Sequence, residues 1–264
     1  MDLTNVYIGF ALATFAGLST GIGSLLGLYS KFENKRLLSL ALGFSAGVMI
    51  YVSFMELLLL SFDSLSGIYG HTYGQLIGVT SFISGLLVML FIDQLFDHHS
   101  IADFISRSSN KEESLLIRTG VFSAIALAIH NFPEGFATFT AAVYDPAVGM
   151  TLAIAIAIHN IPEGLAVSVP IYYATKSKSK AFWISFASGL AEPLGAVIGF
   201  LIFRTVYNEA LFGISFALCA GIMIYVALNE LLPVAKEYGK PSDPIMGVTA
   251  GIIVMSISLI LMYA

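Results

Sequence analysis

The chain has 264 residues, of which 57% are hydrophobic and 11% charged, and its mean hydropathy is +0.87. A soluble domain of this size does not carry so much apolar surface, so the composition predicts an integral membrane protein built from helices. The net charge of −5 is small and no basic stripe favours nucleic acid, while the single cysteine, Cys219, excludes an intramolecular disulfide.

Eight apolar stretches follow one another, each close to the length needed to cross the hydrocarbon core of a bilayer. They are predicted at Val6–Tyr29, Leu37–Leu60, Tyr73–Phe96, Leu115–Val143, Ala147–Tyr173, Ala181–Phe203, Leu211–Leu232 and Ile245–Tyr263. The breaks between them carry charges or turn formers, such as Asp63 to Gly70. No positive n-region precedes the first stretch, so we expect a span there rather than a cleaved signal. We therefore expect a single transmembrane domain over residues 1–264.

The basic residues predict the orientation. With both termini outside, eleven of the twelve lysines and arginines fall on the inner side, and Arg204 alone falls outside. The eleven are Lys31, Lys35, Arg36, Arg107, Lys111, Arg118, Lys176, Lys178, Lys180, Lys236 and Lys240. Because basic residues concentrate on the cytoplasmic side, this distribution predicts a multi-pass protein of the cytoplasmic membrane with both ends outside.

The two ends of the chain repeat each other. Residues 46–52 (AGVMIYV) return at 220–226 (AGIMIYV), an offset of 220 − 46 = 174, and Glu-Leu-Leu follows each copy, at Glu56 and Glu230. Glycine patterns in the first and third spans return in the sixth and eighth, at offsets of 189 − 17 = 172 and 251 − 85 = 166. Spans 1–3 then correspond to spans 6–8 in the opposite direction, with spans 4 and 5 related likewise, a 3+2+3 arrangement. Inverted repeats are typical of alternating-access transporters, although a channel also fits.

A polar motif occurs twice inside the apolar stretches, as His-Asn-x-Pro-Glu-Gly at residues 130–135 and 159–164, which are 159 − 130 = 29 residues apart. On a helix, positions i, i+1 and i+4 form one polar stripe, so each copy presents an imidazole, an amide and a carboxylate together. Ionisable side chains at membrane depth cost several kcal/mol and mark function. Two facing stripes predict a divalent-cation site.

Each motif also contains a proline. Pro133 and Pro162 cannot donate to the carbonyls of Ile129 and Ile158, so we expect a kink beside each histidine. A freed carbonyl at membrane depth needs a polar partner such as water or an ion. The alternative is that the prolines only bend packed helices and the polar residues bond one another.

Other ligand-type residues lie at the same depth. Glu192 in the sixth span and Met49 in the second fall near their span midpoints, as do the two histidines. Imidazole suits zinc, and carboxylate and amide oxygens extend the site to harder cations. We expect no thiol at the site. Glu56 and Glu230 lie seven residues beyond Met49 and Met223, and we interpret them as the outer and inner ends of the cation pathway, though both would also serve as interface anchors.

The paired motifs, with Glu192-Pro193, resemble the ZIP (Zrt/Irt-like) metal transporters, most of all the bacterial ZupT/GufA branch, over essentially the whole chain. The resemblance implies import of zinc, and often of iron, manganese, cobalt or cadmium, through a binuclear site. It assigns His130, Glu134, His159 and Glu163 to one ion. It assigns Asn131, Glu134, Asn160, Glu163 and Glu192 to the other, with Glu134 and Glu163 bridging and Met49 as an added soft ligand. Where many relatives have a histidine-rich loop, this chain retains only His98-His99.

Two other classes remain as alternatives. An intramembrane zinc hydrolase would also use histidine and glutamate four residues apart, but Asn131 and Asn160 occupy the place where that chemistry needs its general base. A membrane metal sensor or scaffold would need a soluble domain, which the sequence lacks. We therefore expect a transporter without a catalytic cofactor, whose partners are divalent cations and the bilayer. A homodimer is compatible with the sequence.

Overall fold

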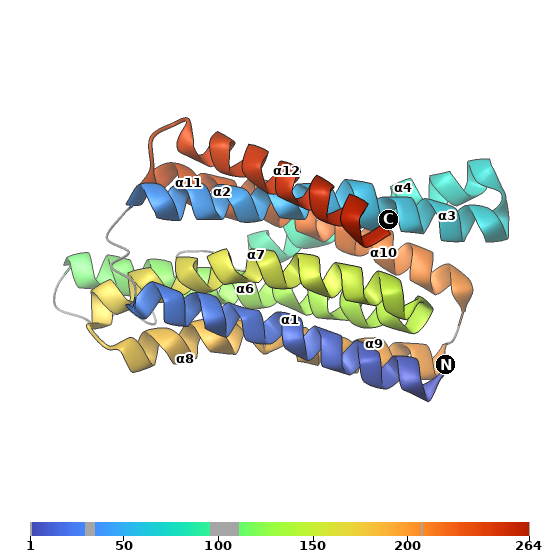
Figure 1. The fold of residues 1–264 in the computed structure, drawn as a ribbon, viewed down its shortest axis with the longest axis horizontal. Helices are drawn as coiled ribbons and strands as arrows, with labels where there is room; N and C mark the ends of the chain where they lie inside the picture. Colours follow the sequence, from blue (N-terminus) through green and yellow to red (C-terminus); the bar gives the residue numbers. More distant parts are fainter. Residues whose placement is uncertain (1, 30–34, 96–110, 207, 264) are drawn as a thin grey trace.

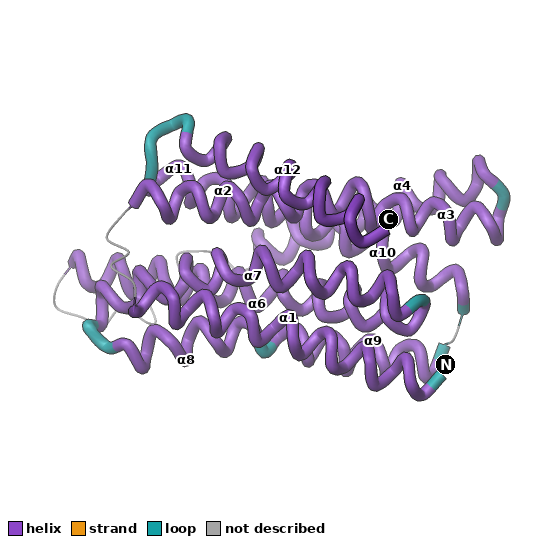
Figure 2. The backbone as a smooth tube through the Cα atoms, in the orientation of Figure 1, coloured by secondary structure: helices purple, strands orange, loops and turns teal. Residues whose placement is uncertain are grey.

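The computed structural model describes residues 2–29, 35–95, 111–206 and 208–263, and every element within these ranges is a helix (Figures 1 and 2). Most elements are α-helices: α1 (Leu3–Tyr29), α2 (Lys35–Val52), α3 (Leu58–Tyr69), α4 (His71–Leu95), α6 (Lys111–Tyr144), α7 (Pro146–Thr175), α8 (Lys178–Gly189), α9 (Ala191–Thr205), α10 (Glu209–Val226), α11 (Leu232–Tyr238) and α12 (Asp243–Tyr263). Two are short π-helical turns, η1 (Ser53–Leu57) and η2 (Ala227–Leu231). The loop that carries His98 and His99 lies outside the described residues.

Seven helical stretches within the described residues are long and apolar enough to cross a membrane. They run over Leu3–Leu28, Lys35–Tyr69, His71–Gln94, Pro146–Val169, Lys178–Thr205, Glu209–Tyr238 and Asp243–Leu261. This confirms the prediction of a polytopic helical membrane protein. Helix α6 covers the predicted fourth span but is not among the seven, so the count of eight spans stays a prediction.

The helices form two bundles that lie against each other (Figure 1). In the first bundle, α1 and α6 pack on α7, and α8 and α9 cover α1 and α6. In the second bundle, α12 packs on α2, and α10 packs on α3 and α4. The bundles meet where α2 contacts α7 and where α10 contacts α6. The helices α6 and α7, which carry the two polar motifs, are therefore the ones through which the first bundle contacts the second.

The second span is longer than the sequence predicts. We expected a break from Asp63 to Gly70, but α3 continues to Tyr69 and ends only at Gly70, whose φ of 78° is left-handed. The helix persists because Ser61 and Leu65 are fully buried within the bundle, so its inner face keeps its packing. Asp63 therefore stands on a helix rather than in a loop.

The π-helical turns interrupt the two helices at matching places. η1 contains Glu56 and η2 contains Glu230, the residues that we interpreted as pathway ends. The start of η2 follows the start of η1 by 227 − 53 = 174 residues, which is the offset of the sequence repeat. A π-helical turn holds one extra residue, and such turns are frequent at functional sites.

The sixth predicted span is broken in the middle. α8 ends at Gly189 and α9 begins at Ala191, so Glu192 lies in the first turn of α9. Pro193 cannot donate a hydrogen bond to the carbonyl of Gly189, four residues earlier, which accounts for the break. A carboxylate in the first turn of a helix also faces the positive end of the helix dipole.

Glycines bring the helices of the first bundle into backbone contact at the depth of the motifs. A Cβ atom on Gly23 of α1 would overlap the carbonyl oxygen of Ile161 on α7. A Cβ atom on Gly135 of α6 would overlap the carbonyl oxygen of Glu192 on α9. Glycine alone permits this approach, because any side chain would separate the backbones.

Candidate metal site

The predicted ligands lie in the interior of the molecule. Six of them have 0% of their surface exposed: Asn131, Glu134, His159, Asn160, Glu163 and Glu192. They come from α6, α7 and the start of α9, all in the first bundle. The side chain of His130 lies outside the described part of the structure.

Glu134 and His159 are joined directly across α6 and α7. Nε2 of His159 lies 3.2 Å from Oε1 of Glu134, and Nδ1 lies 3.1 Å from the carbonyl oxygen of Ala155. A carbonyl oxygen only accepts, so Nδ1 carries a proton. Nε2 is then the ring nitrogen that faces the carboxylate oxygen. An imidazole nitrogen and a carboxylate oxygen are both ligand types that a divalent cation accepts.

The two asparagines anchor the site to its surroundings. Nδ2 of Asn160 donates to Oε1 of Glu192 and, at 3.0 Å, to the carbonyl oxygen of Ala16 on α1. Nδ2 of Asn131 donates to the carbonyl oxygen of Ser188 on α8, at 3.2 Å. The amide nitrogen of each asparagine thus donates to a neighbouring protein group, while its oxygen has no partner among the described residues.

Several oxygens at the centre have no hydrogen-bond partner within the described part of the structure. They are Oδ1 of Asn131, Oε2 of Glu134, Oδ1 of Asn160 and Oε2 of Glu192, and each is inaccessible to solvent. Oγ1 of Thr20, the residue that the repeat sets opposite Glu192, is also without a partner. Burying an unpaired polar group costs about 1–3 kcal/mol, and more when it is charged. These oxygens are the ligand type that a divalent cation takes.

The third carboxylate of the set is held by a residue that the sequence reading missed. Oγ of Ser45, on α2, lies 3.0 Å from Oε1 of Glu163 and 3.4 Å from the carbonyl oxygen of His159. Ser45 is fully buried and belongs to the second bundle. Its position four residues before Met49, on the same helix face, is the one sequence signal that could have identified it.

Glu192 interacts with the other two glutamates. Glu192 is close enough to Glu134 and Glu163 for electrostatic repulsion between the carboxylates. Among the described side chains, however, no three histidines, cysteines, aspartates or glutamates are already arranged around one metal position. The structure brings the ligands together as pairs, Glu134 with His159 and Asn160 with Glu192, rather than as one closed cluster.

A thiol lies close to the backbone of the first motif. Sγ of Cys219, on α10, is 3.5 Å from the carbonyl oxygen of Pro133, the residue before Glu134. Cys219 and Pro133 also line an apolar cavity of about 660 Å³ between α4, α6, α9 and α10. The sequence could not place this cysteine, because 86 residues separate it from Pro133.

The remaining predicted residues lie on the second bundle. Met49 is fully buried on α2. Glu56 is 5% exposed within η1, and Glu230 is half-buried within η2. Next to Glu230, Tyr225 donates a 2.8 Å hydrogen bond to Asp93 on α4, and the matching first half has no acid at the corresponding position.

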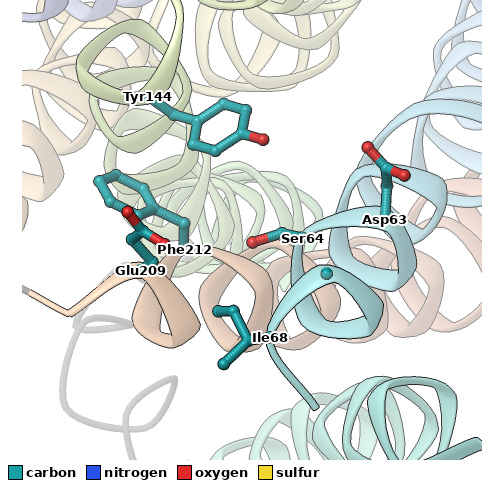
Figure 3. A pocket seen from close by; sticks show the side chains of 7 residues that line it. Asp63, Ser64, Ile68, Tyr144, Glu209 and Phe212 are labelled. Carbon is teal, nitrogen blue, oxygen red and sulfur yellow. The ribbon is translucent and has the colours of Figure 1, made fainter. Parts of the chain in front are cut away.

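A further cavity opens away from the centre, between α3 and the adjoining ends of α6 and α10. It measures about 450 Å³, and Asp63, Ser64, Tyr144 and Glu209 line it. Figure 3 shows the hydroxyl groups of Ser64 and Tyr144 directed into the space between these helices. Two carboxylates, of Asp63 and Glu209, therefore line this cavity.

Comparison with known proteins gives consistent results. The family described as ZIP Zinc transporter matches residues 102–259. A protein named Zinc transporter ZupT from Chlorobium chlorochromatii is 49% identical over 97% of this chain and 98% of its own length. Proteins of the same name from Chlorobaculum parvum (49%, over 97% and 98%) and Oceanobacillus iheyensis (46%, over 98% and 100%) are similar throughout. The chain therefore belongs to the ZIP zinc transporter family.

Proposed function

We propose that this protein imports Zn²⁺, with Fe²⁺, Mn²⁺, Co²⁺ and Cd²⁺ as further substrates, through a binuclear site at the junction of its two bundles. The observation that carries the proposal is the set of buried, unpaired oxygens on Asn131, Glu134, Asn160 and Glu192. Unpaired oxygens next to mutually repelling carboxylates are costly in a membrane interior, and a divalent cation removes both costs at once.

The ligands divide into two sets around the bridging glutamates. One ion takes the imidazoles of His130 and His159 with Glu134 and Glu163. The other takes the oxygens of Asn131, Asn160 and Glu192 with the same two glutamates, and Met49 adds a soft ligand from α2. Three carboxylates against two divalent ions leave net positive charge, which favours release of one ion. Binding must be firm enough to select and weak enough to release.

Inverted repeats support alternating access as the mechanism. The contact of Gly23 on α1 with α7 recurs as the contact of Gly195 on α9 with α6, and 195 − 23 = 172 is the sequence offset. The partner glycines, Gly164 on α7 and Gly135 on α6, differ by 164 − 135 = 29, the spacing of the motifs. These matching contacts support a 3+2+3 arrangement of eight spans. They also support a single domain at residues 1–264.

The pathway runs from the outer face to the cytoplasm. Asp63 and Glu209 collect cations at the outer cavity, Glu56 passes them inward, and Glu230 lies on the release side. The two termini lie toward the same end of the long axis (Figure 1), which agrees with both being outside. The positive-inside distribution assigns the other end to the cytoplasm in a cytoplasmic (inner) membrane.

The alternative classes fare less well. The family consists of transporters, so the protein is a transporter rather than an enzyme, and the hydrolase alternative is not supported. A sensor or scaffold also lacks support from the family. A homodimer stays a prediction.

Uptake by the purified protein tests the proposal. The protein is reconstituted in proteoliposomes that enclose a fluorescent zinc chelator, and external Zn²⁺ is added. We expect saturable uptake that is absent from empty vesicles and from vesicles with the Glu134→Ala/Glu163→Ala double variant. Uptake equal to that of empty vesicles, with the protein correctly folded and inserted, would overturn the function.

A further inference from the structure

Ser45 connects the second bundle to the candidate site. Its hydroxyl lies 3.0 Å from Oε1 of Glu163, and both side chains have 0% of their surface exposed. Ser45 is on α2 and Glu163 is on α7, 118 residues further along the chain. This contact therefore depends on the packing of one bundle against the other.

The other two glutamates are held within the first bundle. Glu134 on α6 contacts His159 on α7, and Glu192 on α9 accepts a hydrogen bond from Asn160, which is also on α7. Glu163 differs, because a hydrogen-bond donor comes to it from outside the bundle that carries the predicted ligands. A change at Ser45 can therefore alter Glu163 without removing any predicted ligand.

The chemistry of the hydroxyl decides what Ser45 does. A serine has one O–H donor, and the carboxylate oxygen at 3.0 Å is a closer and more strongly charged acceptor than the carbonyl of His159 at 3.4 Å. The bond restrains the carboxylate of Glu163 through its Oε1 atom. Resting on the function proposed above, we propose that Ser45 is a positioning residue that sets the orientation of Glu163 for cation binding.

The related half of the chain supports this assignment independently. The offset of 174 relates Ser45 to Cys219, which reaches the corresponding turn of α6 and contacts the carbonyl oxygen of Pro133 at 3.5 Å. Both halves thus send a side chain from the second bundle to a motif in the first. A thiol is a weak donor, so only the Ser45 half has a strong donor aimed at a carboxylate.

Three substitutions separate the hydroxyl from the volume of the side chain. Ser45→Ala removes the donor, Ser45→Cys replaces it by a weak one of similar shape, and Ser45→Thr keeps it. The matched control is Ser39→Ala, because Ser39 is an equally buried serine on α2 whose hydroxyl donates at 2.7 Å to the carbonyl oxygen of Ala235, away from the predicted ligands. All four are compared at equal amounts of folded protein.

Zinc uptake gives the first readout. A hydrogen bond to a charged group is worth about 1.5–3 kcal/mol, so we expect Ser45→Ala and Ser45→Cys to raise the apparent KM for Zn²⁺ by roughly tenfold or more. The maximal rate should stay within about twofold, because the predicted ligands remain. Ser45→Thr should keep the wild-type KM, and Ser39→Ala should as well. An unchanged KM in Ser45→Ala, or an equal rise in Ser39→Ala, would overturn the role.

Infrared spectroscopy gives a second readout that a purely structural role would not move. The carboxylate band of Glu163 is identified in zinc-minus-apo difference spectra as the band that Glu163→Gln removes. We expect this band to shift in Ser45→Ala and Ser45→Cys but not in Ser39→Ala. An unshifted band contradicts the inference even if uptake falls. Failure of the wild-type protein to take up zinc would instead contradict the proposed function, and the apo spectra of the same variants would still test the contact.

Discussion

Nε2 of His159 and Oε1 of Glu134 are 3.2 Å apart, although the two residues belong to different copies of the motif on different helices. The carboxylate of the first motif therefore contacts the imidazole of the second motif. His159 gives its Nδ1 proton to the carbonyl of Ala155, so Nε2 is the nitrogen that faces the carboxylate and is open to a proton or a metal ion. Proton and cation compete for the same two atoms.

This competition predicts a dependence on pH. The imidazoles of His130 and His159 bind a cation only when they are neutral, and acidification adds protons to them. Zinc uptake should therefore fall as the pH is lowered from about 7.5 to about 5.5. Binding of Zn²⁺ to the purified protein in weak buffer should release about one proton per site, as followed with an indicator dye. A flat pH profile, at fixed free zinc and without a membrane potential, would contradict the assignment of the histidines as ligands.

The bridging role of two glutamates predicts unequal effects of substitution. Glu134→Ala and Glu163→Ala each remove a ligand from both ions, and one charged contact is worth about 1.5–3 kcal/mol, so uptake should fall by at least about tenfold. Glu192→Ala removes a ligand from one ion and should leave part of the zinc uptake. The measurement is initial uptake into proteoliposomes at equal protein content. Near-normal uptake in Glu163→Ala would reject the binuclear arrangement.

The backbone contact at Gly135 predicts a large effect of a single methyl group. A Cβ atom there would overlap the backbone of Glu192, and overpacking of this kind costs about 1–3 kcal/mol. Gly135→Ala should therefore lower the Tm in detergent and reduce uptake. Gly67→Ala is the matched control, because nothing lies within 4 Å of its added Cβ atom and alanine favours a helix by roughly 0.5–1 kcal/mol. Equal Tm values for the two variants would contradict the close packing.

The proposed inverted arrangement of the two halves predicts different roles for the two pathway glutamates. Glu56→Gln should raise the apparent KM for external zinc more than it lowers the maximal rate, because a carboxylate near the entrance concentrates cations. Glu230→Gln should mainly slow release. Single cysteines at positions 56 and 230, in a Cys219→Ala background, should react with impermeant reagents from opposite sides. Labelling of both from the same side would contradict the topology and the pathway together.

The sequence predicted the candidate site well where the functional residues follow the periodicity of a single helix. The spacing of His159, Asn160 and Glu163 on one helix predicted a polar stripe, and these residues are indeed fully buried. The contacts of Ser45 and Cys219 could not be predicted, because they join helices that are distant in sequence. The periodicity of a helix does not indicate which other helix packs against it. The end of α3 was misread because Asp63 and Ser64 have the composition of a loop, whereas burial of neighbouring Leu65 holds the helix together.

The paired π-helical turns bear on the ancestry of the chain. A π-helical turn amounts to one inserted residue in a regular helix, and η1 and η2 carry this insertion at equivalent positions, 227 − 53 = 174 residues apart. A single insertion in an ancestral three-helix unit, followed by gene duplication, explains both π-helical turns. Separate insertions in the two halves would require one more event. By that reasoning the glutamate-bearing π-helical turn is older than the full-length protein.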